Sequence, residues 1–387
     1  MKIGIVGGGP AGLYFALLMK KLDAAHTVRI VEQNPAGATF GFGVVFSDRA
    51  LSFLEDADPE SYSDIALCLQ SWPDQMIVHR DQRVRIDGLG FSGIPRLALL
   101  QLLQQHCRRR GVELHFEQRL TDLSAFTDYD LVVGADGVNS FVREAYREHL
   151  QPSVEVLSNR YVWYATPQLF DALTLTFRES ADGVFVAHHY RYAADRSTFI
   201  VECDAETWER AGLAAMSEEE SRQFCERVFA PDLGGQSLLT NRSLWSTFKA
   251  VTNRRWSQEN VVLIGDALRT VHFSIGSGTR NALEDAIALA RAFAACGADV
   301  HAALRVFEEA RRPGVEKFLA VAQRSYAWYE RFREKMRLEP LPFAYDYLMR
   351  SGRISHARLK EVSPRFAATY EASYGSEPMI APRAGKE

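Results

Sequence analysis

The 387-residue sequence predicts an α/β protein in which an antiparallel-sheet domain is inserted into an α/β domain and a helical cap follows. A glycine-rich turn between a strand and a helix lies near the N-terminus. Aromatic and β-branched runs recur roughly every ten residues between 151 and 256, and amphipathic periodicity begins after residue 300. A chain of this length can form two or three domains.

The glycine-rich turn has the spacing of a nucleotide site. Residues 3–6 form a short apolar run, and Gly7, Gly9 and Gly12 follow it as G-x-G-x-x-G before a helical stretch. In a Rossmann-like turn the first glycine permits the bend, the second lets the backbone approach a pyrophosphate, and the third lets the helix pack closely on the sheet. The helix N-terminus then favours an anion. We therefore expect a dinucleotide site here.

An acidic residue stands where such a site needs one. A second apolar run, residues 28–31, ends at Glu32, twenty residues after Gly12. A carboxylate at this place can accept hydrogen bonds from a ribose. The expected contacts of the first loop are Gly7, Gly9, Pro10, Ala11, Gly12, Glu32 and Gln33.

The composition is that of an ordinary globular protein, with 24% charged residues and a net charge of −4. This balance gives no reason to expect a nucleic-acid partner. The five cysteines are scattered and lack metal-ligand spacing, so we expect free thiols in a reducing cytoplasm and no metal site. No run of about 20 apolar residues occurs, so we expect no membrane span.

Two further segments contain expected ligand contacts. The loop 35–47 is rich in glycine beside Phe40 and Phe42, and it can either approach a flat ligand or serve as a surface connector. Gly43 and Val44 are its expected contacts. Arg96, which opens a later helical stretch, is another.

A third apolar run, residues 129–134, leads into Asp136 and Gly137 and then into a helix. An Asp-Gly pair by itself is common in turns. Here the sequence resembles the flavoprotein monooxygenases of the p-hydroxybenzoate hydroxylase class, whose second signature has the form matched by Asp136, Gly137, Ser140 and Arg143. The resemblance implies FAD as the dinucleotide, Asp136 and Gly137 at the edge of its site, and NADH or NADPH as a visiting co-substrate.

The third signature of this class has a match between residues 260 and 285. An apolar strand ends in Gly265 and Asp266, a Gly-x-Gly turn follows, and the next helix contains Glu284 and Asp285. The resemblance implies that Asp266 accepts hydrogen bonds from the ribityl hydroxyls. Helix N–H groups at the turn are expected to stabilise the negative charge of reduced flavin. The expected contacts are Gly265, Asp266, Gly276, Ser277, Gly278 and Thr279.

The likeness extends over nearly the whole chain to one branch of the class. Residues 34–48, 272–279 and 343–356 look like salicylyl-CoA 5-hydroxylase and the monooxygenase half of anthraniloyl-CoA monooxygenase/reductase. Residues 160–178 also look like the tryptophan hydroxylase of violacein biosynthesis. Arg269 and Phe273 depart from the wider class, which has His and Pro there, so the loop over the flavin is expected to differ in shape or charge.

The resemblance and the changes in composition predict the domain boundaries. Residues 1–75, 96–150 and 257–300 are expected to form the Rossmann-like FAD-binding domain, and residues 76–95 and 151–256 the substrate domain. Residues 301–375 are expected to form a C-terminal helical region that is broken at Pro313. Residues 376–387 are expected to be a disordered tail.

The expected function is hydroxylation of an aromatic ring through a C4a-hydroperoxyflavin formed with NAD(P)H and O2. The whole-chain resemblance favours an aryl-CoA thioester such as salicylyl-CoA as the substrate. A candidate cluster for the CoA phosphates is formed by Arg350, Arg353, Arg358 and Lys360, and its alternative interpretation is a solvated helix face.

Two histidines are candidate catalytic groups, because histidine exchanges protons near neutral pH. His272 lies in the loop expected over the flavin, and His189 lies in an apolar strand. Strand alternation places His188 and His189 on opposite faces, so at most one of them faces a pocket.

Two alternatives to this function share the fold. The first is a hydroxylase of a free aromatic compound, such as tryptophan or an indole-type metabolite. The second is a flavin reductase or dehydrogenase that transfers no oxygen. A flavin-dependent halogenase is disfavoured, because no W-x-W-x-I-P motif occurs among the six tryptophans.

Overall fold

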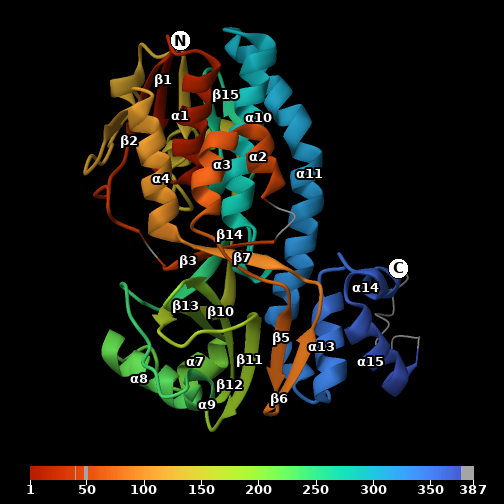
Figure 1. Cartoon of the computed structure of the whole chain (residues 1–387). Coiled ribbons are helices and arrows are strands. Elements are labelled where there is room, and N and C mark those ends of the chain that lie inside the picture. Colours follow the sequence, from red (N-terminus) through yellow and green to blue (C-terminus); the bar gives the residue numbers. More distant parts are fainter. Residues whose placement is uncertain (40, 48–50, 376–387) are drawn as a thin grey trace. The chain divides into compact units, whose positions relative to one another are not determined.

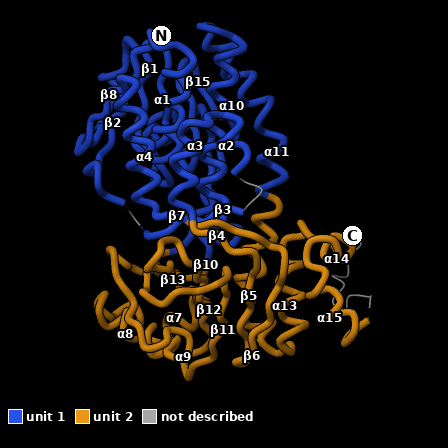
Figure 2. Tube along the Cα trace, viewed as in Figure 1, with its two compact units in different colours: residues 1–69, 94–157, 247–319 blue, residues 70–93, 158–246, 320–387 orange. Residues whose placement is uncertain are grey.

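The computed structural model describes residues 1–39, 41–47 and 51–375 (Figure 1). The chain forms two compact units (Figure 2). Unit 1 comprises residues 1–69, 94–157 and 247–319, and unit 2 comprises residues 70–93, 158–246 and 320 onward. Phe40 and the expected tail 376–387 lie outside the described residues.

A six-stranded sheet forms the centre of unit 1. Its order is β15-β16-β9-β1-β2-β8, with β1 parallel to both β2 and β9. The inner strands β1, β9 and β16 are short, almost continuous apolar runs because few of their positions face water, whereas the edge strands β8 and β15 are polar. The strands of the sheet are β1 (Lys2–Val6), β2 (Thr27–Val31), β8 (Glu113–His115), β9 (Leu131–Gly134), β15 (Ser257–Gln258) and β16 (Val261–Leu263).

Helix α1 (Pro10–Leu22) packs against α4 (Arg96–Arg109) and α10 (Gly278–Cys296) in the core of unit 1. Ten consecutive residues of α1, from Pro10 to Met19, are buried, which is expected of a helix with neighbours on several sides. The other elements of this unit are β3 (Gly43–Ser47), α2 (Ser52–Ala57), α3 (Pro59–Ala66), η2 (Ser124–Phe126), α5 (Phe141–Ala145), α6 (Arg147–Leu150), η3 (Gly265–Ala267) and η4 (Phe273–Ile275).

Four elements contain residues of both units. They are β7 (Phe91–Pro95), β10 (Pro152–Thr166), β14 (Ser246–Asn253) and α11 (Val300–Tyr329). Helix α11 runs through Pro313, so the break expected there is wrong. A proline inside a helix removes one backbone hydrogen bond at a cost of about 3 kcal/mol, and apolar packing along a helix of 30 residues offsets that cost.

Unit 2 is built on a seven-stranded sheet of order β14-β10-β13-β12-β11-β5-β6. The expected strands at 160–166, 173–177, 184–192 and 197–203 are confirmed, and β10 to β13 pair antiparallel. The expected hairpin of residues 76–86 is also confirmed as β5 and β6, which turn through Arg80 and Asp81 at positive φ. These strands are β5 (Gln75–His79), β6 (Gln82–Ile86), β11 (Leu173–Ser180), β12 (Gly183–Ala193) and β13 (Arg196–Cys203).

Each face of this sheet packs against helices of unit 2. Leu175 and Val186 pack in one apolar cluster with Phe343 of α13, whereas Phe185 and Phe199 pack on the opposite face with the α8 and α9 region. The remaining elements are β4 (Gln70–Trp72), α7 (Ala205–Arg210), α8 (Glu218–Val228), α9 (Ala230–Leu233), α12 (Phe332–Lys335), α13 (Pro340–Met349), α14 (His356–Val362) and α15 (Pro364–Tyr374).

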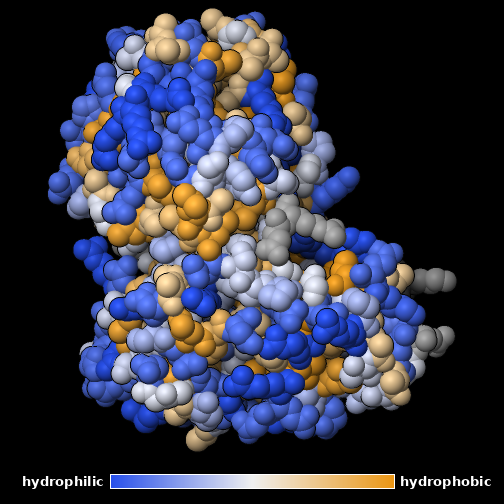
Figure 3. Space-filling view, viewed as in Figure 1, coloured by the Kyte–Doolittle hydropathy of each residue, from blue (hydrophilic) through white to orange (hydrophobic). Residues whose placement is uncertain are grey.

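The face of the molecule in Figure 3 is mostly hydrophilic, with apolar side chains interspersed. Such scattered apolar residues are normal on a protein surface. Among the described residues, none of the helices combines the length and the apolar character needed to cross a membrane.

Candidate functional site

All expected cofactor contacts lie in unit 1. Most lie in the segments that follow β1, β2, β9 and β16, whereas Gly43 and Val44 lie within β3 and Arg96 is the first residue of α4. The first loop is shaped by two glycines. Gly7 has a φ of +107°, and a Cβ atom there would lie 2.3 Å from the carbonyl oxygen of Ala135. A Cβ atom on Gly12 would lie 2.3 Å from the carbonyl oxygen of Gly7. Only glycine therefore allows α1 to begin this close to the sheet.

Gly9 differs from its two neighbours in the motif. A Cβ atom on it would meet nothing within 4 Å, so protein packing does not require glycine there. Gly9 is the N-cap of α1, no side chain caps the helix, and Pro10 follows as its first residue. The first turn of α1 thus has an uncapped N-terminus with open space beside Gly9, which suits a phosphate site.

Glu32 is held in place by the loops beside it. Its Oε2 accepts a hydrogen bond from the Gly8 N–H at 2.8 Å, and its Oε1 accepts from the backbone N–H of Asn34 at 2.8 Å and from Asn34 Nδ2 at 2.7 Å. A carboxylate can accept about four hydrogen bonds. Glu32 can therefore still accept one from a ribose hydroxyl, beside the exposed Gln33.

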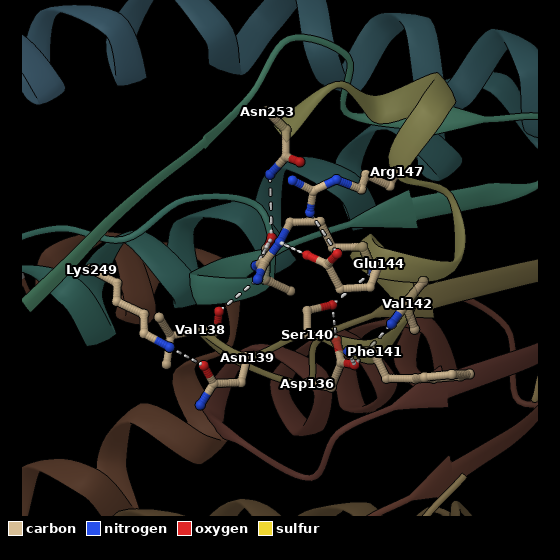
Figure 4. Close-up of polar contacts among 12 residues, drawn as sticks. Asp136, Val138, Asn139, Ser140, Phe141, Val142, Glu144, Arg147, Lys249 and Asn253 are labelled. Carbon is tan, nitrogen blue, oxygen red and sulfur yellow. Dashed lines mark hydrogen bonds and ion pairs between the residues drawn. The ribbon is translucent and has the colours of Figure 1, made fainter. Parts of the chain in front are cut away.

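The carboxylate of Asp136 is occupied by hydrogen bonds from neighbouring residues of the chain (Figure 4). It accepts hydrogen bonds from Ser140 Oγ at 2.5 Å and from the N–H groups of Phe141 and Val142 at 2.7 and 3.1 Å. Burial raises the pKa of Asp136, and these hydrogen bonds oppose that shift. Asp136 therefore shapes the start of α5, and Gly137 follows it at a φ of +79°.

Arg143 joins the second loop to the third. Its buried guanidinium donates to the carbonyl oxygen of Val138 at 2.7 Å and to that of Ala267 at 3.1 Å. Asn253 Nδ2 donates to the same Ala267 oxygen at 3.3 Å. The sequence marks Arg143 as part of a signature, but it contains no signal that Asn253 takes part.

The third loop approaches the first turn of α1. Gly265 has a φ of +62°, and a Cβ atom there would lie 3.1 Å from the Cβ of Ala11. Asp266 follows it with an exposed side chain, although protein atoms crowd around it. This crowding raises the pKa of Asp266, while the positive charges of Arg96 and Arg269 lower it. The Asp266 carboxylate is thus surrounded by protein atoms and still accessible, so it can accept a hydrogen bond from a ligand.

The N-terminus of α10 is also free of a side-chain cap. Ser277 precedes the helix, and its Oγ donates to the carbonyl oxygen of Ile275 at 3.0 Å instead of capping the first turn at Gly278 and Thr279. Gly276 has a φ of +57°, and its Cβ position lies 3.0 Å from Val45 of β3, next to Gly43 and Val44. Unit 1 thus has a second helix N-terminus that can stabilise a negative charge.

Comparison with known proteins agrees with this geometry. Residues 127–322 match the family model described as "FAD binding domain". The chain is 39% identical over 361 residues to a salicyloyl-CoA 5-hydroxylase from a Streptomyces species, covering 91% of this chain and 70% of the relative. It is 39% identical over 354 residues to protodeoxyviolaceinate monooxygenase of Chromobacterium violaceum, covering 90% and 94%. The chain belongs to the FAD-dependent monooxygenases.

Two further similarities extend this result. A 3-hydroxy-4-methyl-anthranilyl-[aryl-carrier protein] 5-monooxygenase of Streptosporangium sibiricum is 37% identical over 356 residues, covering 92% of this chain and 95% of the relative. The fold matches 2-methyl-3-hydroxypyridine-5-carboxylic acid oxygenase with a TM-score of 0.69 at 17% identity, over 95% of this chain and 97% of that one. The expected fold class, FAD cofactor and aromatic hydroxylation are thereby confirmed.

His272 of this FAD-dependent monooxygenase is buried and begins the turn η4. Its Nδ1 accepts a hydrogen bond from the Ser274 N–H at 3.2 Å. Its ring lies 4.7 Å from that of Phe248 and stacks at 4.3 Å on Phe273, the residue that replaces the Pro of the wider class. The structure therefore gives His272 a role in shaping its own loop, and a catalytic role remains a prediction.

His189 is buried in unit 2. Its Nε2 lies 2.9 Å from Thr176 Oγ1, and its ring stacks at 5.1 Å on Phe199. It lines a cavity of about 80 Å³ together with side chains that include Met76, Thr174 and Thr176. Burial holds the pKa of His189 well below its usual value, so the imidazole is neutral near pH 7 and does not act there as a cationic acid.

His188 points to the other face of the same strand, as alternation predicts. Its Nε2 lies 3.0 Å from Glu202 Oε2, and Asn159 Nδ2 donates to Glu202 Oε1 at 2.8 Å. Reasoning from the sequence did not find this buried histidine and carboxylate pair. Their proximity depends on the register between β12 and β13, and no local spacing reveals that register.

Two glycine substitutions separate binding from folding. We expect Gly9→Ala to keep the thermal stability of the protein, because its methyl group meets no protein atom. The methyl group stands in front of the α1 N-terminus, so the Kd for FAD should rise at least about tenfold.

Gly12→Ala should lower the melting temperature of the apo-protein, because its methyl group overlaps Gly7. Fluorescence titration and thermal melting measure the two effects. A Gly9→Ala protein that binds FAD normally would show that α1 does not hold the pyrophosphate.

The raised pKa of Asp266 predicts how the stability of the apo-protein changes with pH, and this direction can be tested. An acid whose pKa is higher in the folded than in the unfolded protein lowers stability as the pH rises above the unfolded value. At pH 7 to 8, Asp266→Asn should therefore leave the apo-protein as stable as before or more stable. Its FAD affinity should fall roughly 10- to 100-fold, since a hydrogen bond to a charged group contributes about 1.5 to 3 kcal/mol.

Differential scanning calorimetry of the apo-protein and titration with FAD from pH 5 to 8 measure both effects of Asp266→Asn. The unmodified protein should lose FAD affinity toward acid pH, because protonation removes the charged acceptor, and the variant should show a flatter profile. Equal FAD affinity in both proteins would remove Asp266 from the site.

Proposed function

We propose that this FAD-dependent monooxygenase hydroxylates the ring of an aromatic acid held as a thioester, with an aryl-CoA such as salicylyl-CoA as the substrate. The observation that supports this proposal is its similarity to two relatives whose names specify thioester-bound aromatic acids. They share 39% and 37% identity with the chain over more than nine-tenths of its length.

The expected CoA cluster does not support the proposal. Arg350 lies 3.8 Å over the ring of Tyr347 and donates to Ser325 Oγ at 3.1 Å. Arg358 forms an ion pair with Glu361, and Lys360 Nζ lies 2.9 Å from Glu371. Arg358 and Lys360 stay about half exposed in these ion pairs, with 45% and 53% of their side chains accessible. The cluster is therefore compatible with its alternative interpretation, a solvated helix face, and its role toward CoA stays a prediction.

Unit 1 supplies the groups that we assign to FAD. The uncapped amides of α1 would hold the pyrophosphate and those of α10 the flavin ring. Glu32 would hold the ribose, and Asp266 would hold the ribityl chain. FAD that is reduced by NADH or NADPH supplies, with O2, an electrophilic oxygen for an electron-rich ring. The uncapped start of α10 stabilises negative charge at the flavin without a protonated base.

We assign the aromatic substrate to the domain of residues 76–95 and 151–256. His189, neutral and hydrogen-bonded to Thr176, can orient a polar group but does not supply a positive charge near pH 7. His272 remains a candidate polar group in the loop that precedes α10. Their catalytic roles are proposals, in which the protein mainly orients the ring and excludes water.

One relative favours a second candidate, hydroxylation of a free aromatic compound. The protodeoxyviolaceinate monooxygenase is as similar in sequence as the salicyloyl-CoA enzyme and matches a larger share of its own length. A substrate of this kind needs no site for a CoA moiety. Arg358 and Lys360, which pair with carboxylates of unit 2, are compatible with a substrate that lacks CoA.

Matched pairs of substrates distinguish the two candidates. We expect salicylyl-CoA to give at least about tenfold more hydroxylated product per unit time than salicylate, because binding energy from the remote part of a substrate supports turnover. The CoA ester should also give less H2O2 per NAD(P)H consumed. Chromatography of the product and a peroxide assay measure these quantities. Faster and better coupled turnover of a free aromatic, such as tryptophan, contradicts the thioester proposal.

The same assay in 18O2 separates a hydroxylase from a reductase that transfers no oxygen. One labelled oxygen atom in the product is the expected result. NAD(P)H oxidation that yields only peroxide with all substrates would support the reductase alternative.

A further inference from the structure

Asp285 of α10 is a completely buried carboxylate with several donors around it. Its Oδ2 accepts a hydrogen bond from the Gly265 N–H at 3.0 Å. Arg269 contacts both of its oxygens through the two ends of the guanidinium, with Nη2 to Oδ1 at 2.8 Å. Arg311 Nε donates to Oδ1 at 3.0 Å. A single carboxylate thus connects the Gly265 turn, Arg269 and α11.

Stability alone does not account for this arrangement. Buried ion pairs lose the solvation of each charge, and well-packed apolar side chains of similar size often stabilise a protein as much or more. Arg269 is only 3% exposed and lies 5.9 Å from the ring of Trp256. Glu284 Oε2 lies 2.7 Å from Arg311 Nη2, and Glu284 Oε1 lies 2.7 Å from Arg280 Nε, so Asp285 belongs to a network of charged side chains.

The contacts of Arg269 close a ring around the third loop. Its backbone N–H donates to the carbonyl oxygen of Gly265 at 2.9 Å, and its side chain binds Asp285, which in turn binds the Gly265 N–H. The turn of residues 265–269 is therefore tied at both ends. Asp266 is the first residue after the tied glycine, and it is exposed although Gly265 and Ala267 on either side of it are buried.

We propose that Arg269 is a positioning residue for FAD, which acts together with Asp285 by fixing the turn of residues 265–269 so that Asp266 is held toward the ribityl chain. This inference rests on the proposed placement of FAD at Asp266. Arg269 is assigned an indirect role because both Nη atoms of its guanidinium are bound to Asp285.

The charge of Arg269 adds to its geometric effect. It lowers the pKa of Asp266 against the larger effect of burial, as does the charge of Arg96 from α4. Arginine stays protonated at every physiological pH, whereas the histidine found here in much of the wider class titrates near neutrality. Arg269 therefore provides a permanent positive charge behind the Asp266 carboxylate.

Arg269→Lys tests this role because it keeps the charge and removes the two-point contact with Asp285. We expect the FAD Kd to rise at least about tenfold while the melting temperature of the apo-protein stays near that of the unmodified protein. The matched control is Arg291→Lys, the same exchange at an exposed arginine of α10. Arg291 is not among the groups bonded to Asp285 or to the turn, so the FAD Kd of this variant should be unchanged.

A double-mutant cycle shows whether Arg269 acts through Asp266. In the Asp266→Asn background, Arg269→Lys should raise the FAD Kd by less than twofold. An equal tenfold effect in both backgrounds, or no effect of Arg269→Lys in the unmodified protein, overturns the inference. If Asp266→Asn alone leaves the FAD Kd unchanged, the placement of FAD at Asp266 fails instead, so the two failures are distinguishable.

Discussion

Close backbone packing at the first turn of α1 is the constraint on which the rest of unit 1 depends. Gly7 lies against the carbonyl of Ala135, Gly12 lies against Gly7, and Gly265 lies against Ala11. Side chains at these glycines would separate three loops that come from distant parts of the chain. Because glycine has no side chain, the three loops can meet at the N-terminus of α1, which no side chain caps. In the proposed FAD site, the anionic cofactor would supply the stabilisation that a capping residue provides elsewhere.

The acidic residues around this point have different tasks. Asp136 is occupied by the start of α5 and Glu32 is partly occupied by Gly8 and Asn34, whereas Asp266 is exposed. Burial raises the pKa of both Asp136 and Asp266, and of these two only Asp266 is exposed. This combination is unfavourable for the apo-protein and favourable for binding, as expected when a functional group is kept at some cost in stability.

Much of this fold follows from local patterns in the sequence. The G-x-G-x-x-G spacing places α1, the alternation of residues 76–86 places the β5 and β6 hairpin, and the apolar runs place the strands of both sheets. The break at Pro313 was wrong because packing along α11 outweighs the local cost of proline. Local propensity is thus overridden where a long helix has apolar partners along its length.

The contacts that could not be predicted depend on three-dimensional proximity. Arg143 reaches Ala267 across 124 residues, and Asp285 reaches Gly265 and Arg269 from the following helix. Arg269 was predicted only to change the shape or charge of its loop, and the structure turns it inward, onto Asp285. His188 and Glu202 meet only through strand register. Such pairs have no fixed spacing in the sequence, so motifs indicate the loops of the site but not the interactions that hold them.

Hydrogen exchange of the apo-protein with and without FAD tests the central claim most directly, that the start of α1, the turn of residues 265–269 and the start of α10 form one FAD site. Mass spectrometry of peptides reports the exchange of each loop separately. The account predicts that FAD slows exchange in three separate segments, residues 7–13, 265–269 and 276–281. Protection confined to residues 7–13, or found only in unit 2, would contradict it.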